Sequence, residues 1–360
     1  MDLRQWRLLD TGPRTAAENM ALERVLLTAR ERDWTPDTLH FLQFKPHCVL
    51  VGYHQNVSLE VEEQYCRDHG LDINRRISGG GCIYMDESQL GWELIARKGT
   101  PGIPGRLEDM YRLLCEGAVR GFRKLGVDAR YRPLNDIEVD GRKISGTGGT
   151  EDAQAFIFHG TVLTDFDIDT MLQSIKLPVK KLEDKQIQSF RQRVVSLREL
   201  LGAAPPIGQV KQAMADGMAE ALGIELCPGP LAAAEEELLA AELPRFQSEA
   251  WIRGGRDVPD ADLLRTVDYK AKGGLIRITL LLNGTRQRIR SIFITGDFFA
   301  YPERGILDLE AALKNTSCEP ERLNQNIRQF FERQAVQIPG VTADDFVQAI
   351  LRAIGVSGAQ

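Results

Sequence analysis

The residues best suited to chemistry form one run, in which two arginines precede a turn of three glycines. The run reads Arg75-Arg76-Ile77-Ser78-Gly79-Gly80-Gly81-Cys82-Ile83-Tyr84. Arginine offers fixed donors that match carboxylate and phosphate oxygens, and glycines let the backbone approach a ligand closely and turn several amides toward it. The run therefore predicts a cradle for a nucleotide or an acyl-adenylate. An ordinary glycine-rich turn with solvated arginines is the alternative interpretation.

A second cluster of polar residues surrounds Asp140-Gly141, a pair typical of the type I′ turn of a hairpin. Side chains alternate along a strand, so Lys143 is expected to share one face with Ser145. Asn135 and Asp136 lie on the opposite arm, where their oxygens suit a Mg²⁺ ion that also binds phosphate. A solvated lysine on a hairpin is the competing interpretation, because most lysines are exposed.

In these runs and in several other motifs, the chain resembles the lipoate-protein ligase family, the acyl-adenylate-forming relatives of the biotin ligases, over most of its length. The other motifs that carry the resemblance are Gly52-Tyr53-His54-Gln55-Asn56 with Glu60 and Glu62, Asp86, His159-Gly160-Thr161, Ile187-Gln188-Ser189 through Arg193-Val194, and Gly296-Asp297-Phe298-Phe299. The resemblance implies an α+β fold. A mixed-sheet catalytic domain is expected over residues 1–250, and a smaller α+β accessory domain over residues 251–360.

The resemblance also implies the chemistry, with ATP and Mg²⁺ as cofactors and lipoate as the substrate. The carboxylate would attack the α-phosphorus of ATP, and a lysine of an acceptor protein would then take the lipoyl group from lipoyl-AMP. Lys143 is the expected catalytic residue and Asp136 the expected metal ligand. The expected ATP- and lipoyl-AMP-binding residues are Arg76, Ser78, Gly79, Gly80, Gly81, Cys82, Ile83, Tyr84, Asn135, Asp136, Lys143, Ser145, Gly146, His159 and Gly160. His159 has a second interpretation, as a satisfied histidine of the core.

Three departures from the family pattern fall in these motifs: Cys82 where many members carry alanine, Met85 where many carry histidine, and the run Gly146-Thr147-Gly148-Gly149. They predict a reshaped mouth of the site and a narrow set of acceptors, and neutral drift in a general enzyme is the alternative interpretation. The expected acceptor is an apo lipoyl-acceptor protein, either one like the H protein of glycine cleavage or a lipoyl domain of a 2-oxoacid dehydrogenase.

Two other functions compete with the ligase. The first is an acyltransferase of the same superfamily, which would move octanoyl through a thioester on Cys82 and need no ATP; its thiol would need a lowered pKa. The second is a non-catalytic module that binds a lipoyl group or its carrier, against which the presence of Arg76, Asp136 and Lys143 argues. A biotin ligase is a weaker alternative, because the chain lacks the Gly-Arg-Gly-Arg run of those enzymes.

Composition limits the remaining classes. The 360 residues carry a net charge of −6, which argues against nucleic acid as a partner. Six cysteines without metal spacing fit reduced thiols, and neither a secretory signal nor a membrane span is visible. A cytoplasmic protein is therefore expected, with no membrane as a partner.

The elements that must position these residues follow from periodicity and breakers. Helices are predicted over Ala16–Arg32, Glu60–His69, Leu107–Leu125 and Pro205–Leu222, and an exposed helix over Leu231–Leu243 that ends before Pro244. Strands are predicted over Leu39–Phe44, Cys48–Val51, Leu71–Arg76, Leu90–Ala96 and Ala155–Leu163. In the last third, a hairpin of Leu275–Leu282 and Arg286–Thr295 turns at Asn283-Gly284 and precedes helices over Leu307–Lys314, Glu321–Gln334 and Ala343–Ile354.

Overall fold

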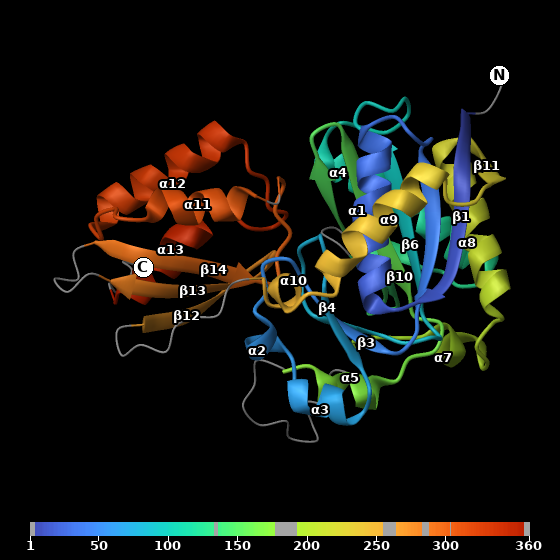
Figure 1. Cartoon of the computed structure of the whole chain (residues 1–360), viewed down its shortest axis with the longest axis horizontal. Coiled ribbons are helices and arrows are strands. Elements are labelled where there is room, and N and C mark those ends of the chain that lie inside the picture. Colours follow the sequence, from blue (N-terminus) through green and yellow to red (C-terminus); the bar gives the residue numbers. More distant parts are fainter. Residues whose placement is uncertain are drawn as a thin grey trace.

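The computed structural model describes residues 4–132, 136–176, 193–254, 264–282, 288–302 and 304–355. Figure 1 shows two lobes, a larger one that holds the first two thirds of the chain and a smaller C-terminal one. Each lobe has a hydrophobic core: one cluster is formed by buried residues between 271 and 354, and three others are formed mainly by the larger lobe, although Tyr301 of the smaller lobe joins one of these. The arrangement is α+β, as predicted.

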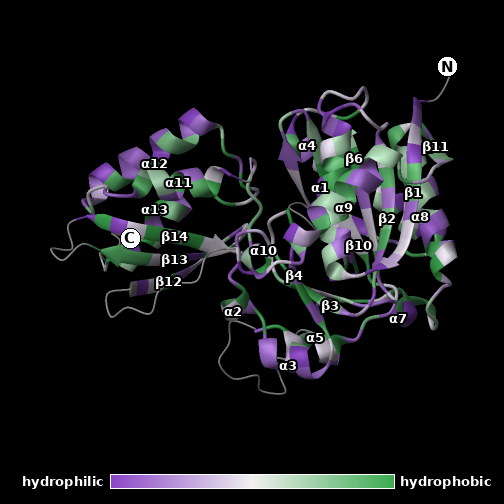
Figure 2. Cartoon of the chain, viewed as in Figure 1, coloured by the Kyte–Doolittle hydropathy of each residue, from purple (hydrophilic) through white to green (hydrophobic). Residues whose placement is uncertain are grey.

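An eight-stranded mixed sheet forms the centre of the larger lobe. Its strands are, in spatial order, β11 (Ile224–Pro228), β1 (Arg4–Arg14), β2 (Thr38–Phe44), β6 (Leu90–Arg97), β10 (Ala155–Val162), β9 (Arg142–Asp152), β8 (Asp136–Val139) and β7 (Arg130–Arg132). β1 pairs in parallel with β2 and β11, and all other neighbours are antiparallel. The sheet is buried on both faces, and Figure 2 shows its inner strands as predominantly hydrophobic.

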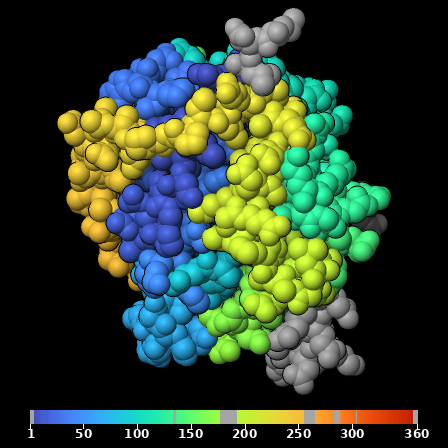
Figure 3. Space-filling view, turned by 90° about the vertical axis from the view of Figure 1, so that its right-hand side faces the viewer, coloured from blue at the N-terminus to red at the C-terminus, as the bar shows by residue number. Residues whose placement is uncertain are grey.

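Helices cover the two faces in pairs. Helices α4 (Leu107–Lys124) and α8 (Ile207–Leu222) pack on one face, around Phe122, Met214 and Met218. Helix α1 (Ala16–Glu31) packs on the other face with α9 (Ala233–Phe246), and a capping box between Thr15 and Glu18 sets its start. Figure 3 shows the α8 to α9 segment running across the N-terminal part of the chain.

Helix α9 differs from the prediction in two ways. It continues through Pro244 to Phe246, and although its outer side is exposed as predicted, Glu235 is buried and receives a bidentate bond from Arg7 at 2.6 and 2.7 Å. This fully desolvated ion pair and the packing of Leu238 and Leu239 hold the helix in place despite the backbone bond that a proline cannot make.

A second, three-stranded sheet carries the glycine turn, in the order β4 (Asp72–Arg75), β3 (Cys48–Val51) and β5 (Ile83–Met85). The predicted helix over Glu60–His69 is two short helices, α2 (Val57–Glu60) and α3 (Glu63–Asp68), because Val61 between them forms a β-bridge with Ile175. Helices α5 (Ile168–Ser174), α7 (Leu197–Leu201) and α10 (Glu249–Arg253) complete this lobe.

The smaller lobe is an antiparallel sheet of β12 (Leu264–Ala271), β13 (Gly274–Leu282) and β14 (Ile289–Gly296), packed against α11 (Gly305–Leu313), α12 (Pro320–Gln334) and α13 (Ala343–Ile354). The predicted pairing of the last two strands is confirmed, and their turn at Asn283-Gly284 lies outside the described residues. Among the described residues, no helix combines the length and the apolar character that a membrane span requires. The predicted division after residue 250 falls inside α10 and stays a prediction.

Candidate functional site

Arg76 braces the glycine turn from inside. Its buried guanidinium donates to the carbonyl of Leu50 at 2.9 Å and to those of Gly79 and Gly81 at 2.9 and 2.8 Å. Burial lowers its pKa from an ordinary value far above neutrality. The side chain thus closes the turn between β4 and β5 into a loop of defined shape, and its predicted bond to a phosphate or carboxylate stays a prediction.

Arg75, the other half of the pair, is a structural brace. It is 1 % exposed, and its guanidinium donates to the carbonyls of Gly52, Tyr53 and Gln55 at 2.7 to 2.9 Å. It also donates to the carbonyls of residues 251 and 252 in α10. The two arginines therefore have different roles. Arg76 shapes the turn, and Arg75 joins the 52–55 loop to the segment that leads to the smaller lobe.

The smaller lobe reaches the glycine turn through Phe298 and Phe299, which follow β14. The amide of Gly80 donates to the carbonyl of Phe298 at 2.9 Å, and the ring of His54 stacks on that of Phe298 at 5.5 Å. A Cβ on Gly79 would lie 2.6 Å from the Phe298 carbonyl oxygen, and one on Gly80 would lie 2.7 Å from the Phe299 ring. The glycines that the sequence assigns to a ligand also make room for these aromatic residues.

Lys143 lies just after the predicted hairpin turn, which the positive φ angles of Asp140 and Gly141 confirm. Its ammonium is 2.6 Å from the carboxylate of Asp136 on the opposite arm, while Asn135 lies outside the described residues. A bulge in the ladder at Ile137/Glu138 interrupts the alternation expected of this strand. The shared face of Lys143 and Ser145 therefore does not follow from strand period alone.

Gly146 links Lys143 to strand β10. A Cβ there would come within 2.9 Å of the Lys143 side chain, so the glycine gives that chain its path, and its amide donates to Thr161 Oγ1 at 3.3 Å. The start of β9 is also held from outside, because the amide of Lys143 donates to Arg193 at 2.7 Å and its carbonyl accepts from Val195 at 2.9 Å. Lys143 thus has a fixed backbone position, and its side chain passes Gly146, the residue whose amide binds Thr161.

A slot of about 40 Å³ runs from Thr161 along the sheet face under α1. Apolar side chains form most of its wall: Leu42, Phe44, Leu50, Ile83, Met85 and Trp92. Four polar ones also line it: Glu23, Arg76, Glu93 and His159. Of the predicted site residues, the slot brings together Arg76, Ile83, His159 and Gly160, and the Gly146 to Thr161 bond places Lys143, Asp136 and Gly146 near one end of it.

His159 fits both of its interpretations. It shares a hydrogen bond of 3.3 Å with Ser78 of the glycine turn, and it faces the slot. Burial, and secondarily the charge of Arg76, lowers its pKa to about 3, so the ring is neutral at physiological pH. A neutral imidazole can offer a slot ligand one donor or one acceptor without a charge.

The side chains of Cys82 and Tyr84 belong to a hydrophobic cluster and are not among the residues that line the slot. Both pack with Val49, Val51 and Cys66 beneath the small sheet, while Ile83 between them faces the slot. Burial raises the pKa of the Cys82 thiol well above its ordinary value, although Arg76 opposes the shift. The Tyr84 hydroxyl pairs with His47 at 2.8 Å. Their predicted ligand contacts stay predictions.

Two polar residues of the slot, Glu23 and Glu93, are not indicated by any motif in the sequence. Ligand atoms of Glu23, Glu93 and His159 lie within 4.8 Å of one another. Glu23 and Glu93 were overlooked because each stands inside an apolar run that reads as plain core. A charged residue at a position whose helical or strand period points inward is the signal that would have found them.

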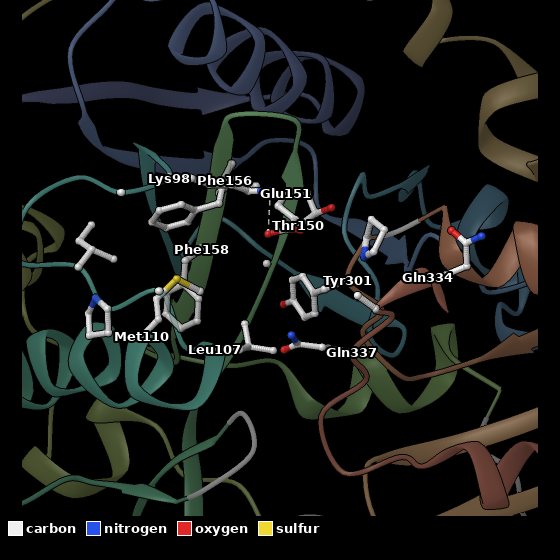
Figure 4. A pocket seen from close by; sticks show the side chains of 18 residues that line it. Lys98, Leu107, Met110, Thr150, Glu151, Phe156, Phe158, Tyr301, Gln334 and Gln337 are labelled. Carbon is white, nitrogen blue, oxygen red and sulfur yellow. Dashed lines mark ion pairs between the residues drawn. The ribbon is translucent and has the colours of Figure 1, made fainter. Parts of the chain in front are cut away.

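A larger cavity of about 340 Å³ lies between the two lobes (Figure 4). Met110, Phe156 and Phe158 line it from the larger lobe, and Tyr301 and Gln337 line it from the smaller one. Neighbouring strand residues point to opposite faces, so Phe158 and His159 belong to different sides of the sheet. This cavity is therefore separate from the slot that holds the predicted site residues.

Two family models match the chain: the lipoyl protein ligase A/B catalytic domain over residues 15–219 and the bacterial lipoate protein ligase C-terminus over residues 266–350. Octanoyltransferase LipM of Kyrpidia tusciae is 31% identical over 271 residues, which cover 69% of this chain and 98% of that protein. A bi-partite lipoate protein ligase of Thermoplasma acidophilum, described with its E2 lipoyl domain, has a TM-score of 0.63 at 26% identity and covers 72% of this chain and 100% of its own. LipL1 of P. falciparum in complex with lipoate has a TM-score of 0.72, covering 96% of this chain and 99% of its own, and its 15% identity shows a shared fold.

Proposed function

The chain belongs to the lipoyl protein ligase A/B family, and on that premise we propose that it activates lipoate with ATP and attaches the lipoyl group to a lysine of an acceptor protein. In the first step the carboxylate oxygen bonds to the α-phosphorus and the bond to pyrophosphate breaks. In the second step the acceptor amine bonds to the acyl carbon, and AMP leaves as the amine loses a proton. Both steps build negative charge that the protein must stabilise.

The observation that carries the proposal is the placement of Lys143 beside the Thr161 end of the slot. An acyl chain that fills the apolar slot leaves its carboxylate at that end, within the reach of an ammonium held by Asp136 at 2.6 Å. A fixed cation there would relieve the repulsion between the acyl carboxylate and the α-phosphate.

The other roles follow from the same geometry. A single carboxylate such as Asp136 suits Mg²⁺, which takes most of its remaining ligands from phosphates and water; bound Mg²⁺ would neutralise phosphate charge. For the Gly80 amide to donate to a phosphate, the Phe298 carbonyl that it now binds has to leave. The slot itself holds room for about three waters. An eight-carbon chain would enter only when the flexible Met85 and its neighbours shift.

We propose a lipoyl domain as the acceptor, supported by the relative whose description includes its own lipoyl domain. The predicted preference for a protein like the H protein of glycine cleavage is the narrower proposal. The departures at Met85 and Gly148 support this preference less than expected, because Met85 is buried in the slot wall and Gly148 lies under the Phe299 ring. A competition between apo H-like proteins and 2-oxoacid dehydrogenase lipoyl domains decides it: a similar kcat/KM for both would remove the narrow preference.

The transferase is the second candidate, because the relative from Kyrpidia tusciae that is 31% identical over 271 residues is named octanoyltransferase LipM. Such a transfer needs a thiolate, and all six cysteines lie in the described residues. Four of them are buried. Cys227 lies on the edge strand β11, which is far in sheet order from β9. Burial raises the pKa of the Cys82 thiol, which disfavours its thiolate. The match of residues 266–350 to a ligase C-terminus also favours the ligase.

One experiment separates the candidates. The full chain is incubated with an apo lipoyl domain and either lipoate, ATP and Mg²⁺ or octanoyl carrier protein without ATP, and the acceptor is weighed by mass spectrometry. The ligase predicts a lipoyl mass shift and pyrophosphate only in the first mixture. Lys143→Ala should abolish both signals, whereas Lys314→Ala on the exposed end of α11 should change neither. A shift only in the second mixture establishes the transferase, and no shift in either leaves a binding module.

A further inference from the structure

Two carboxyl groups line the slot beyond Thr161. Glu93 of β6 pairs across the sheet with His159, two residues along from the Gly91–Thr161 pair, and Glu23 comes from the middle of α1. The two side chains are at most 2 % exposed, and their oxygens lie within 4.8 Å of each other. Glu93 also pairs with His40 Nδ1 at 2.9 Å, and His40 Nε2 pairs with Thr11 at 2.8 Å. Two elements thus bring a carboxyl group each to one part of the slot, and His40, which is not among the residues that line it, bonds to one of them.

Burial lowers the negative charge of this network by favouring protonated carboxyl groups. Burial raises the pKa of Glu93 to about 7 and that of Glu23 well above its ordinary value, since two adjacent carboxylates cannot both ionise in an apolar setting. Burial lowers the pKa of His40 to about 3, so the His40–Glu93 contact joins a neutral imidazole to a carboxyl group and is not an ion pair. The carboxyl pair therefore shares a proton.

One acceptor in this network is left over. Glu23 Oε2 is buried, and it has no hydrogen-bond partner among the described residues. Glu23 lines the slot, so a slot ligand is the group that can reach this atom. A buried acceptor without a partner costs about 1 to 3 kcal/mol, and a methyl group placed against it would leave that cost in place.

We propose that the Glu23–Glu93 pair reads the far end of the acyl chain and selects a chain that carries a hydrogen-bond donor there over one that ends as a plain alkyl. A thiol or a hydroxyl would donate to Glu23 Oε2, so the dithiol form of the lipoyl group belongs to the favoured class and octanoyl does not. This inference rests on the proposed function only in taking the slot as the acyl-binding site.

The same atoms do not favour a metal ion in place of the acyl tail. Glu23, Glu93 and His159 have suitable ligand atoms within 4.8 Å of one another. The positive charge of buried Arg76, however, acts on both Glu23 and His159. A cation of charge two beside a fixed guanidinium would meet repulsion in a medium of low dielectric constant.

The test measures binding of free acids to the full chain by calorimetry without ATP, so that it does not depend on adenylation. Wild type should bind 8-hydroxyoctanoate about fivefold more tightly than octanoate, as one added hydrogen bond of ~1 kcal/mol predicts. Dihydrolipoate should exceed octanoate in the same direction. Glu23→Leu should remove the hydroxyl preference, and Glu236→Leu on the exposed side of α9 should keep it.

Each result decides the inference. Equal binding of the two acids by wild type, or binding of neither, overturns it, and this arm needs no variant to fold. Metal retained in stoichiometric amount by wild type and lost in Glu23→Gln also overturns it. A fivefold preference without pyrophosphate release from any acid would keep the inference while ATP-dependent activation fails.

Discussion

Gly148 in β9 tests how the smaller lobe is seated on the catalytic lobe. A Cβ at this position would lie 2.1 Å from one ring carbon of Phe299 and 2.4 Å from the next, where ordinary contacts begin at 3.4 Å. In Gly148→Ala the ring therefore has to retreat by roughly 1.3 Å, the difference between 3.4 and 2.1. The same two ring carbons lie within 3.0 Å of a Cβ built on Gly80, so the shift also disturbs the contact with the glycine turn and the core against which the ring packs.

The expected cost is bounded by the burial of the ring. Burying a phenylalanine side chain fully is worth about 1.5 to 3 kcal/mol. Because Phe299 is partly exposed, we expect Gly148→Ala to lower the free energy of unfolding by about 2 kcal/mol. Phe299→Ala removes the obstacle, and in that background Gly148→Ala should be neutral or slightly stabilising, because alanine restricts the unfolded chain. The coupling energy of the two changes should be about 2 kcal/mol, within the range for residues in contact.

Urea unfolding of the two single variants and the double variant measures this cycle, with the acylation rate of each as a second readout. Gly208→Ala is the matched control, because a Cβ there meets nothing within 4 Å. If Gly148→Ala destabilises the Phe299→Ala protein as much as it destabilises wild type, the contact between the lobes is not the reason for this glycine.

Four further outcomes are expected. Lys143→Ala should lower pyrophosphate release with lipoate by about 100-fold or more, the effect typical of removing one group that stabilises developing charge, and a near wild-type rate would contradict its role. Cys82→Ala should keep most activity, and a thioester trapped on Cys82 by an octanoyl carrier protein donor would contradict this. Because the folded pKa of Glu93 is raised to about 7, the folded state holds its proton more tightly, so stability falls as pH rises from about 4.5 to 7. Glu93→Gln should therefore gain stability relative to wild type over that window, and parallel melting curves from pH 5 to 8 would refute the assignment. Residues 1–254 alone should fold, since among the described residues their core clusters take only Tyr301 and Phe299 from the smaller lobe, but should transfer lipoyl groups far more slowly, and an undiminished transfer rate would contradict a role for the smaller lobe.

Local patterns predicted most of the elements, and tertiary contacts explain the failures. The apolar stripe of α4 and the bounds of β3 and α13 follow from periodicity alone. The split between α2 and α3 did not, because it depends on a bridge from Val61 to Ile175, a residue more than a hundred positions away. Strand β1 was missed for the same reason: its partners β2 and β11 lie far along the chain.

The parts of the candidate site that consist of neighbouring residues could be predicted from the sequence. The parts that folding brings together from distant elements could not. A few neighbouring residues are enough to identify the glycine turn and the lysine of the hairpin. The slot cannot be identified in this way, because Glu23 and Glu93 each look like one polar interruption in an apolar element. The separate role of Arg75 was hidden as well, since the carbonyls that it binds in α10 come from some 176 residues later in the chain.

The bonds from Arg75 to α10 fix the point at which the smaller lobe is tethered. Ten chain steps separate Gly254 from Leu264, so the lobe cannot move farther than about 36 Å from an anchor that is hydrogen-bonded beside the glycine turn. Phe298, Phe299 and the glycine turn belong to one chain, so their contact forms within the molecule and does not depend on how much protein is present. The contact can therefore be individually weak, open for a substrate and close again, at the same rate in a dilute cell extract as in a concentrated sample.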